Sequence, residues 1–162
     1  LSFAWGHTLP MIAHAVGAHV ETIDTIWEKW ATPTPIATAQ GTIAAGTCAA
    51  VRFEIRAHID GAPRLILEHV NRMGPAAAPH WPRPRSVESD AYRIEIDGSP
   101  CITQETVFRG GERRDPNLGG CLATGMRALN AIPAVCAAAP GLLSALDVPF
   151  TPGRGVIRSA RA

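Results

Sequence analysis

A single histidine stands out among the polar residues of the segment 68–73, where residue types alternate as in a β-strand. In a strand, His69 points to the same side as Leu65 and Leu67, because side chains alternate between the two faces. An imidazole half-buried among apolar groups needs a hydrogen-bond partner or a ligand. The pattern predicts that His69 lines a pocket and orients a carbonyl or an amine. The alternative is a sheet histidine that is satisfied within the fold.

Small residues dominate a second segment, between residues 119 and 133. Helical spacing places Thr124, Arg127 and Asn130 near one stripe of this segment. Small residues let a ligand or another backbone approach a helix closely. The segment therefore predicts one of two structures. Its small residues either leave room for a substrate or cofactor at the start of a helix, or let the helix pack tightly against a sheet.

The sequence lacks the common self-sufficient catalytic and metal-binding motifs. It contains no P-loop, no H-E-x-x-H and no G-x-S-x-G, and its four cysteines show no C-x-x-C spacing. The run Gly153-Arg154-Gly155 has neither a strand before it nor a helix after it, so it is not a dinucleotide fingerprint. Carboxylate pairs such as Asp24 and Glu28 are typical of a solvated strand face. We expect no metal site and reduced thiols, with a disulfide as the alternative.

Helices are predicted near both ends of the chain. The first covers 3–20, with a kink at Pro10 and an end near Gly17. Its predicted apolar face comprises Trp5, Leu9, Ile12, Ala15 and Val16. The second covers 117–139 and is expected to end or kink at Pro133.

Strands are predicted between these helices. From Glu21 onward the residues alternate in polarity, which predicts a strand that Pro33 and Pro35 end, and 36–42 form a short extended piece before a turn or one-turn helix at 42–45. Two hairpins follow, 51–59 with 65–73 around Asp60-Gly61, and 91–96 with 100–109 around Asp97-Gly98. A proline-rich loop at 74–90 must bury Trp81 against something. These elements predict an α+β fold, a mostly antiparallel sheet with helices packed on one face.

Composition bounds the domain organisation. The chain has 162 residues, 46% of them hydrophobic and 18% charged, with a formal net charge of +1. This balance supports one globular domain over 1–152, followed by a basic, flexible tail over 153–162. It argues against nucleic acid and membrane partners and against disorder, and we expect a cytoplasmic location.

The beginning of the chain carries no initiator Met and no signal peptide pattern. It opens Leu1-Ser2-Phe3, inside the predicted helical pattern. We interpret this start as a cut in a longer polypeptide. The alternative is a complete small protein from which the Met was removed.

Five stretches together resemble one family. They are Trp5-Gly6-His7-Thr8 with the following helix to Glu21; Gly41–Thr47; Leu67–Met73 with Trp81-Pro82; Ala123–Val135; and Pro140–Pro149. In this order and spacing, the chain resembles the C-terminal domain of dihydrodipicolinate-reductase-like proteins of actinobacteria. That group includes 2,4-diaminopentanoate dehydrogenase and the native amine dehydrogenases. The chain lacks the His-His-x-x-Lys run of true dihydrodipicolinate reductases, which puts their substrate in doubt here.

The resemblance implies a parent protein with an N-terminal Rossmann domain that binds NAD or NADP. The second domain would supply much of the substrate pocket and the interface of a homodimer. The chemistry of such proteins is hydride transfer between a nicotinamide cofactor and a C=N or C=O group. The match implies His69 as a pocket residue, and Thr124 and Asn130 as further groups on the returning helix.

We therefore expect the substrate-binding and dimerisation half of a nicotinamide-dependent oxidoreductase that acts on a small organic substrate. Trp5 and Trp81 are expected as walls of the pocket around His69. The chain alone would carry no catalytic residue, would need no cofactor and would not transfer a hydride. The rival hypothesis is a free-standing small-molecule-binding or dimerisation module without catalysis.

Overall fold

The computed structural model describes residues 5–85, 90–149, 151 and 153. The chain divides into two compact units, Leu1–Arg83 and Pro84–Ala162, and each is considered by itself. The elements of the first unit are α2 (Thr8–Ala15), β1 (Thr22–Ala31), β2 (Ile36–Thr38), β3 (Gly41–Ile43), β4 (Cys48–Ile59) and β5 (Ala62–Arg72). The elements of the second are β6 (Tyr92–Ile96), β7 (Ile102–Thr106) and α3 (Pro116–Ala137).

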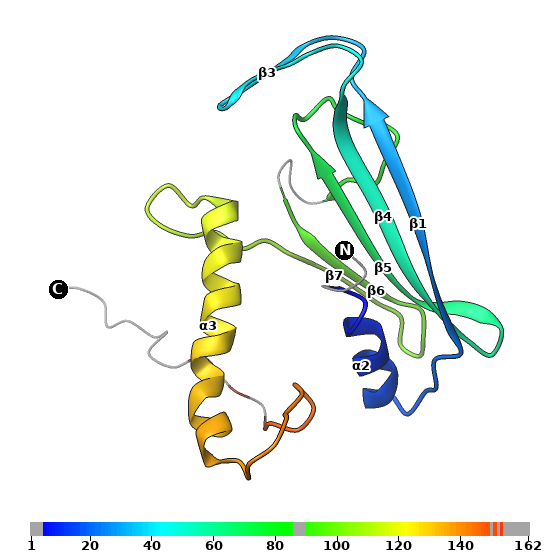
Figure 1. Ribbon diagram of the computed structural model, residues 1–162, viewed down its shortest axis with the longest axis vertical. Coiled ribbons are helices and arrows are strands. Elements are labelled where there is room, and N and C mark those ends of the chain that lie inside the picture. Colours follow the sequence, from blue (N-terminus) through cyan, green and yellow to red (C-terminus); the bar gives the residue numbers. More distant parts are fainter. Residues whose placement is uncertain (1–4, 86–89, 150, 152, 154–162) are drawn as a thin grey trace. The chain divides into compact units, whose positions relative to one another are not determined.

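The first unit is built on an antiparallel sheet with the strand order β1-β4-β5 (Figure 1). Asp60 and Gly61 join β4 to β5 with φ angles of 52° and 70°, the left-handed conformation that a tight hairpin turn requires. This confirms the predicted hairpin. Between β1 and β4, β2 and β3 form a separate two-stranded hairpin. The turn or short helix predicted at 42–45 is wrong in part, because Gly41–Ile43 pairs as strand β3.

Helix α2 is shorter than predicted and carries no break at Pro10. That proline lies in the first turn, where its missing N–H would have had no partner within the helix. The predicted end at Gly17 is confirmed. Gly17 has a φ of 73°, its N–H donates to the carbonyl of His14, and the N–H of Ala18 donates to that of Ala13. These are the two bonds of a Schellman cap.

The core of the first unit lies between α2 and one face of the sheet. Leu9 of α2 packs with Phe53, Ile55 and Ala57, which alternate along β4. We call this side of the sheet the α2 face. The predicted apolar face of the helix is partly wrong: Leu9 and its neighbour one turn on, Ala13, are buried, whereas Ile12 is 39% and Val16 68% exposed. The helix is rotated so that Leu9 and Ala13 rest on the sheet.

The second unit pairs β6 with β7 and continues into α3. The side chain of Asp115 accepts a hydrogen bond from the N–H of Leu118 at 3.0 Å and caps the helix. Pro133 lies inside α3 and does not end it, so of the two expected effects the ending is wrong and the kink stays a prediction.

The fold is α+β and mostly antiparallel, as predicted. No helix in the described part of the chain combines the length and the apolar character needed to cross a membrane. The predicted tail, 153–162, lies outside the described residues except for Gly153.

Candidate functional site

The strand register lines up three rings across the α2 face. Trp27 of β1 pairs with Phe53 of β4, and Phe53 pairs with His69 of β5. The rings of Trp27 and Phe53 stack at 5.5 Å with an interplanar angle of 6°. The rings of Phe53 and His69 lie 5.1 Å apart. The sequence indicates His69 but not this row, because alternation within one strand does not reveal which residue of the next strand stands beside it.

Trp5, just before α2, completes this cluster. Its ring lies 5.0 Å from that of His69 and meets that of Phe53 edge-on at 5.8 Å, with an angle of 90°. The structure therefore brings Trp5 and His69 together, as expected. We call Trp5, Trp27, Phe53 and His69 the aromatic cluster. Phe53 is 2% exposed and forms its floor, whereas Trp27 is 42% exposed and offers an open ring.

The imidazole of His69 is the titratable group of the aromatic cluster. Burial lowers the pKa of His69, so the neutral ring is favoured. Within the described residues, no side chain or backbone group hydrogen bonds to this imidazole. A neutral imidazole can donate from one nitrogen and accept at the other. The geometry therefore suits the orientation of a carbonyl or an amine against an apolar, aromatic surface.

The lowered pKa of His69 gives a pH dependence. Between the folded value and the unfolded value of about 6.5, the unfolded chain binds more protons, so stability falls as the pH drops through this range. Above this pH range, His69 does not make the unfolding free energy depend on pH. We expect the His69→Gln variant to lose less stability than the wild type when urea unfolding is compared at pH 7.5 and pH 5.5. Parallel pH profiles for the two proteins would contradict the burial of the imidazole.

The opposite face of the same sheet carries charge. Arg52 binds the carboxylate of Glu28 at 2.5 Å and those of Glu54 and Glu68, and Arg56 binds Glu54 at 2.6 Å. Burial opposes the charge on Arg52, but the hydrogen bond and charge of Glu68, with the charges of Glu54 and Glu28, outweigh it and raise the pKa of Arg52. These carboxylates are engaged with arginines, so we assign this face a structural role.

Trp81 belongs to this charged face. Its half-buried ring packs with Ala50, Ala77 and Ala78, and alternation along β4 places Ala50 on the side opposite to Phe53. Arg72 fixes the loop by donating to the carbonyls of Ala77 at 3.1 Å and Pro82 at 2.8 Å. The loop is therefore pinned by Trp81, as expected, but the structure does not bring Trp81 to His69.

Thr124 and Asn130 lie on α3, in the second unit. The hydroxyl of Thr124 donates to the carbonyl of Gly120 at 3.0 Å, and Asn130 is half-buried. Six residues apart on a helix, they project about 120° from one another. Their grouping with His69 stays a prediction.

The small residues at the start of α3 have a structural use. A Cβ on Gly119 would come within 2.5 Å of the backbone of Phe108 and Arg109, so this glycine permits close contact between the helix and the chain that follows β7. Gly125 has open space around it. Of the two interpretations of this segment, the structure supports tight packing at Gly119.

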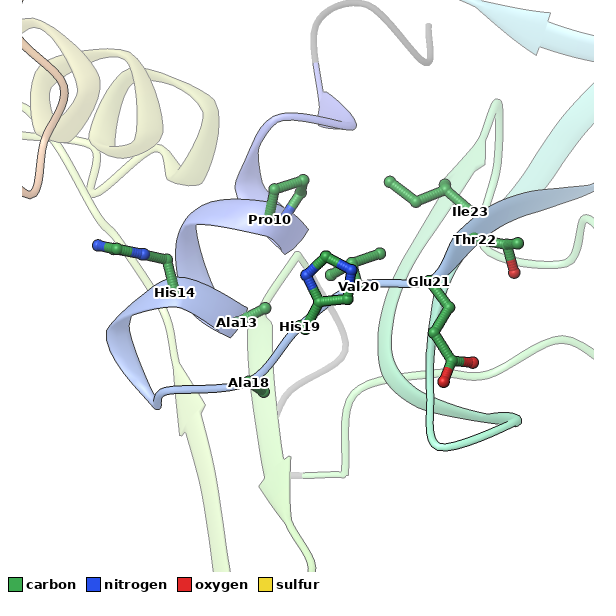
Figure 2. A pocket seen from close by; sticks show the side chains of 9 residues that line it. All are labelled: Pro10, Ala13, His14, Ala18, His19, Val20, Glu21, Thr22 and Ile23. Atoms are coloured by element: carbon green, nitrogen blue, oxygen red, sulfur yellow. The ribbon is translucent and has the colours of Figure 1, made fainter.

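A hollow of about 480 Å³ lies beside α2 and the start of β1 (Figure 2). Figure 2 shows His14 directed away from Val20 and Ile23, which line the hollow. The carboxylate of Glu21 accepts a hydrogen bond from the N–H of Gly61 at 3.0 Å. None of the residues of the aromatic cluster lines this hollow.

The described residues do not fit a nicotinamide dinucleotide. A dinucleotide phosphate rests on the open N-terminus of a helix that follows a parallel strand. The described strands all pair antiparallel, and Asp115 places a carboxylate on the N-terminal amides of α3. No group of three or more potential metal ligands was found among the residues that the structure describes.

Comparison with known proteins identifies relatives. Residues 3–160 match the family described as "2,4-diaminopentanoate dehydrogenase C-terminal domain". An amine dehydrogenase of Streptomyces virginiae is 35% identical over 155 residues, which cover 95% of this chain and 43% of that protein. The chain thus spans less than half the length of this relative. The structure of an amine dehydrogenase from Mycobacterium smegmatis shares the fold, with a TM-score of 0.61 at 19% identity over 90% of this chain and 38% of the other.

Proposed function

The chain belongs to the 2,4-diaminopentanoate dehydrogenase C-terminal domain family, and from this premise we propose that it is the substrate-binding and dimerisation half of a nicotinamide-dependent oxidoreductase. The family confirms the resemblance expected from the five sequence stretches. In this proposal the parent protein transfers a hydride between NAD or NADP and a C=N or C=O group, and it works in the cytoplasm as a homodimer. The greater length of the amine dehydrogenase relative supports the existence of further parts.

The observation that carries the proposal is the position of His69. Its neutral imidazole faces an otherwise apolar, aromatic surface formed by Trp5, Phe53 and Trp27. Such a surface accommodates the carbon skeleton of a small organic substrate, and the imidazole can hold its carbonyl or amine by one hydrogen bond. Water competes poorly for that bond beside apolar rings.

The cofactor would be bound outside this chain. The described residues do not form a dinucleotide phosphate site, so the chain's own contribution is to bind, orient and shield the substrate. We infer that residues 1–152 act as one domain for this purpose. Thr124 and Asn130 stay predicted site residues. Trp81 packs on the charged face, so this proposal does not include it in the surface around His69.

The test uses the gene product at its natural length. The wild type is expected to oxidise NADH or NADPH in the presence of a ketone and ammonia. Because a lost hydrogen bond to a buried substrate group costs about 1–3 kcal/mol, His69→Ala should lower kcat/KM by roughly 10-fold to 100-fold. The melting temperature should stay within a few degrees.

The matched control is His58→Ala. His58 lies on the charged face and pairs with Asp24 at 2.6 Å, so its removal should leave kcat/KM unchanged. Loss of folding in His69→Ala would favour the satisfied sheet histidine. Absence of turnover with either nicotinamide would favour the rival hypothesis of a binding or dimerisation module.

A further inference from the structure

Helix α3 carries its large aliphatic side chains on an exposed side. Leu118, Leu122, Met126, Leu129 and Ile132 are each between 42% and 56% exposed. Their spacing of three and four residues gathers them on one face of the helix, within about 120°. We call these five residues the α3 stripe.

The better-buried side of α3 consists mainly of small residues. Gly119 is buried, and Gly120, Ala123, Ala131 and Ala134 are half-buried. Gly119 meets the backbone after β7, as described above. Within the described residues, the better-covered side of α3 thus carries small side chains, whereas the large apolar side chains of the α3 stripe are exposed. Large exposed apolar patches of this kind mark interaction sites.

The low number of charged residues in α3 also indicates that its exposed apolar side is an interaction site. Arg127 is the single charged residue between Pro116 and Ala137. It lies off the α3 stripe, and its guanidinium donates to the hydroxyl of Thr151 at 2.9 Å. A helix exposed to water normally carries charged residues on its outer face, and the α3 stripe has none.

The size of the α3 stripe indicates what covers it. From Leu118 to Ile132 the stripe is about 21 Å long and one helix wide. Separate chains that associate stably bury about 800 Å² on each partner, more than a strip of this size provides. Two domains of one polypeptide can associate through a smaller contact, because their linkage raises the effective concentration.

We propose that the α3 stripe packs against an apolar surface of the nucleotide-binding domain of the same polypeptide. This inference rests on the proposed function, which requires such a domain. It is also consistent with the amine dehydrogenase relative, of which this chain covers 43%. The α3 stripe would then hold the substrate-binding half against the half that binds the cofactor.

The double variant Leu122→Glu/Leu129→Glu tests the proposal at two chain lengths. In the chain of 162 residues the melting temperature should stay within about 2 °C, because exposed substitutions have small effects. In the natural-length protein it should fall by several degrees, and limited proteolysis between the domains should become at least ten times faster. The control variant Asn117→Glu/Ala128→Glu adds the same number of carboxylates at exposed positions off the α3 stripe and should change neither quantity.

The alternatives give different results. Equal destabilisation at both lengths would mean that the α3 stripe is covered within this chain, and no effect at either length would mean that it faces solvent. Dissociation of a dimer of the short chain, seen by sedimentation, would assign the stripe to a second copy. Each of these results overturns the proposal. Turnover by the natural-length wild type tests the proposed function separately, because melting and proteolysis do not depend on activity.

Discussion

The Phe53→Ala variant is expected to lose about 3–5 kcal/mol of unfolding free energy, the cost of removing a fully buried aromatic ring. Phe53 is 2% exposed and touches the rings of Trp5, Trp27 and His69. Removal of the ring would leave a cavity among these rings and the aliphatic side chains of Leu9 and Ile55, which pack in the same core. A loss of this size is a large part of the stability of a typical domain.

Urea unfolding followed by tryptophan fluorescence measures this effect, since Trp5 and Trp27 border the ring. Ile66→Ala is the matched control. Ile66 lies on β5, is 53% exposed and points to the charged face, so its truncation should cost no more than about 0.5 kcal/mol. Similar losses in the two variants would show that Phe53 is not the floor of the aromatic cluster.

Two glycines of α3 should respond to the same substitution with opposite signs. In Gly119→Ala the new Cβ would lie 2.5 Å from the backbone nitrogen of Arg109, and backbone atoms cannot move aside as a flexible side chain can. We expect a loss of about 1–3 kcal/mol, the usual cost of overpacking. In Gly125→Ala the Cβ meets nothing within 4 Å. Here we expect a gain of about 0.5–1 kcal/mol from the better helix propensity of alanine.

Thermal unfolding of the two variants checks this pair. Each variant controls for the other, because the residue change, the helix and the solvent are the same and only the surroundings of the new methyl group differ. A gain at Gly119 would mean that α3 does not approach the backbone of Phe108 and Arg109. A loss at Gly125 would mean that the open side of α3 is covered within this chain.

Local patterns were enough to predict much of the fold. Alternation along 51–59 and 65–73, with the turn at Asp60-Gly61, predicted the β4–β5 hairpin, and helical spacing with small residues predicted α3. These signals depend on residues close in sequence, so no tertiary contact is needed to read them. The same reasoning placed His69 on the side of Leu65 and Leu67, and the structure has these three on one face.

Features that depend on packing could not be predicted in this way. The periodicity of α2 predicted an apolar face that included Ile12 and Val16, whereas contact with the sheet selects the one that contains Leu9 and Ala13. Pro133 was expected to end or kink the helix, and the helix continues through it. Trp81 was correctly expected to pin its loop, yet the face on which it packs depends on Ala50 and Arg72.

The register of β4 against β5 decides the site. If the pairing of Ile59 with Ala62 at the turn continued unbroken, Phe53 would stand opposite Glu68. A bulge beyond His58 shifts the pairing by one residue, so that Ala57 meets Leu65 and Phe53 meets His69. A shift of one residue moves every following side chain of a strand to the other face.

The sequence by itself therefore determined the two strands, the turn between them and the apolar residues, Leu65 and Leu67, that share a strand face with His69. Only the tertiary structure decided that this histidine shares a face with Phe53, Trp27 and Trp5, away from the charged side of Arg52. The physical reason is that the tight turn at Asp60-Gly61 sets one pairing of β4 with β5. Placing the apolar residues of both strands on the same face requires a pairing shifted by one residue. The bulge satisfies both, because burial of the apolar sides of β4 and β5 under α2 outweighs the loss of one regular pair.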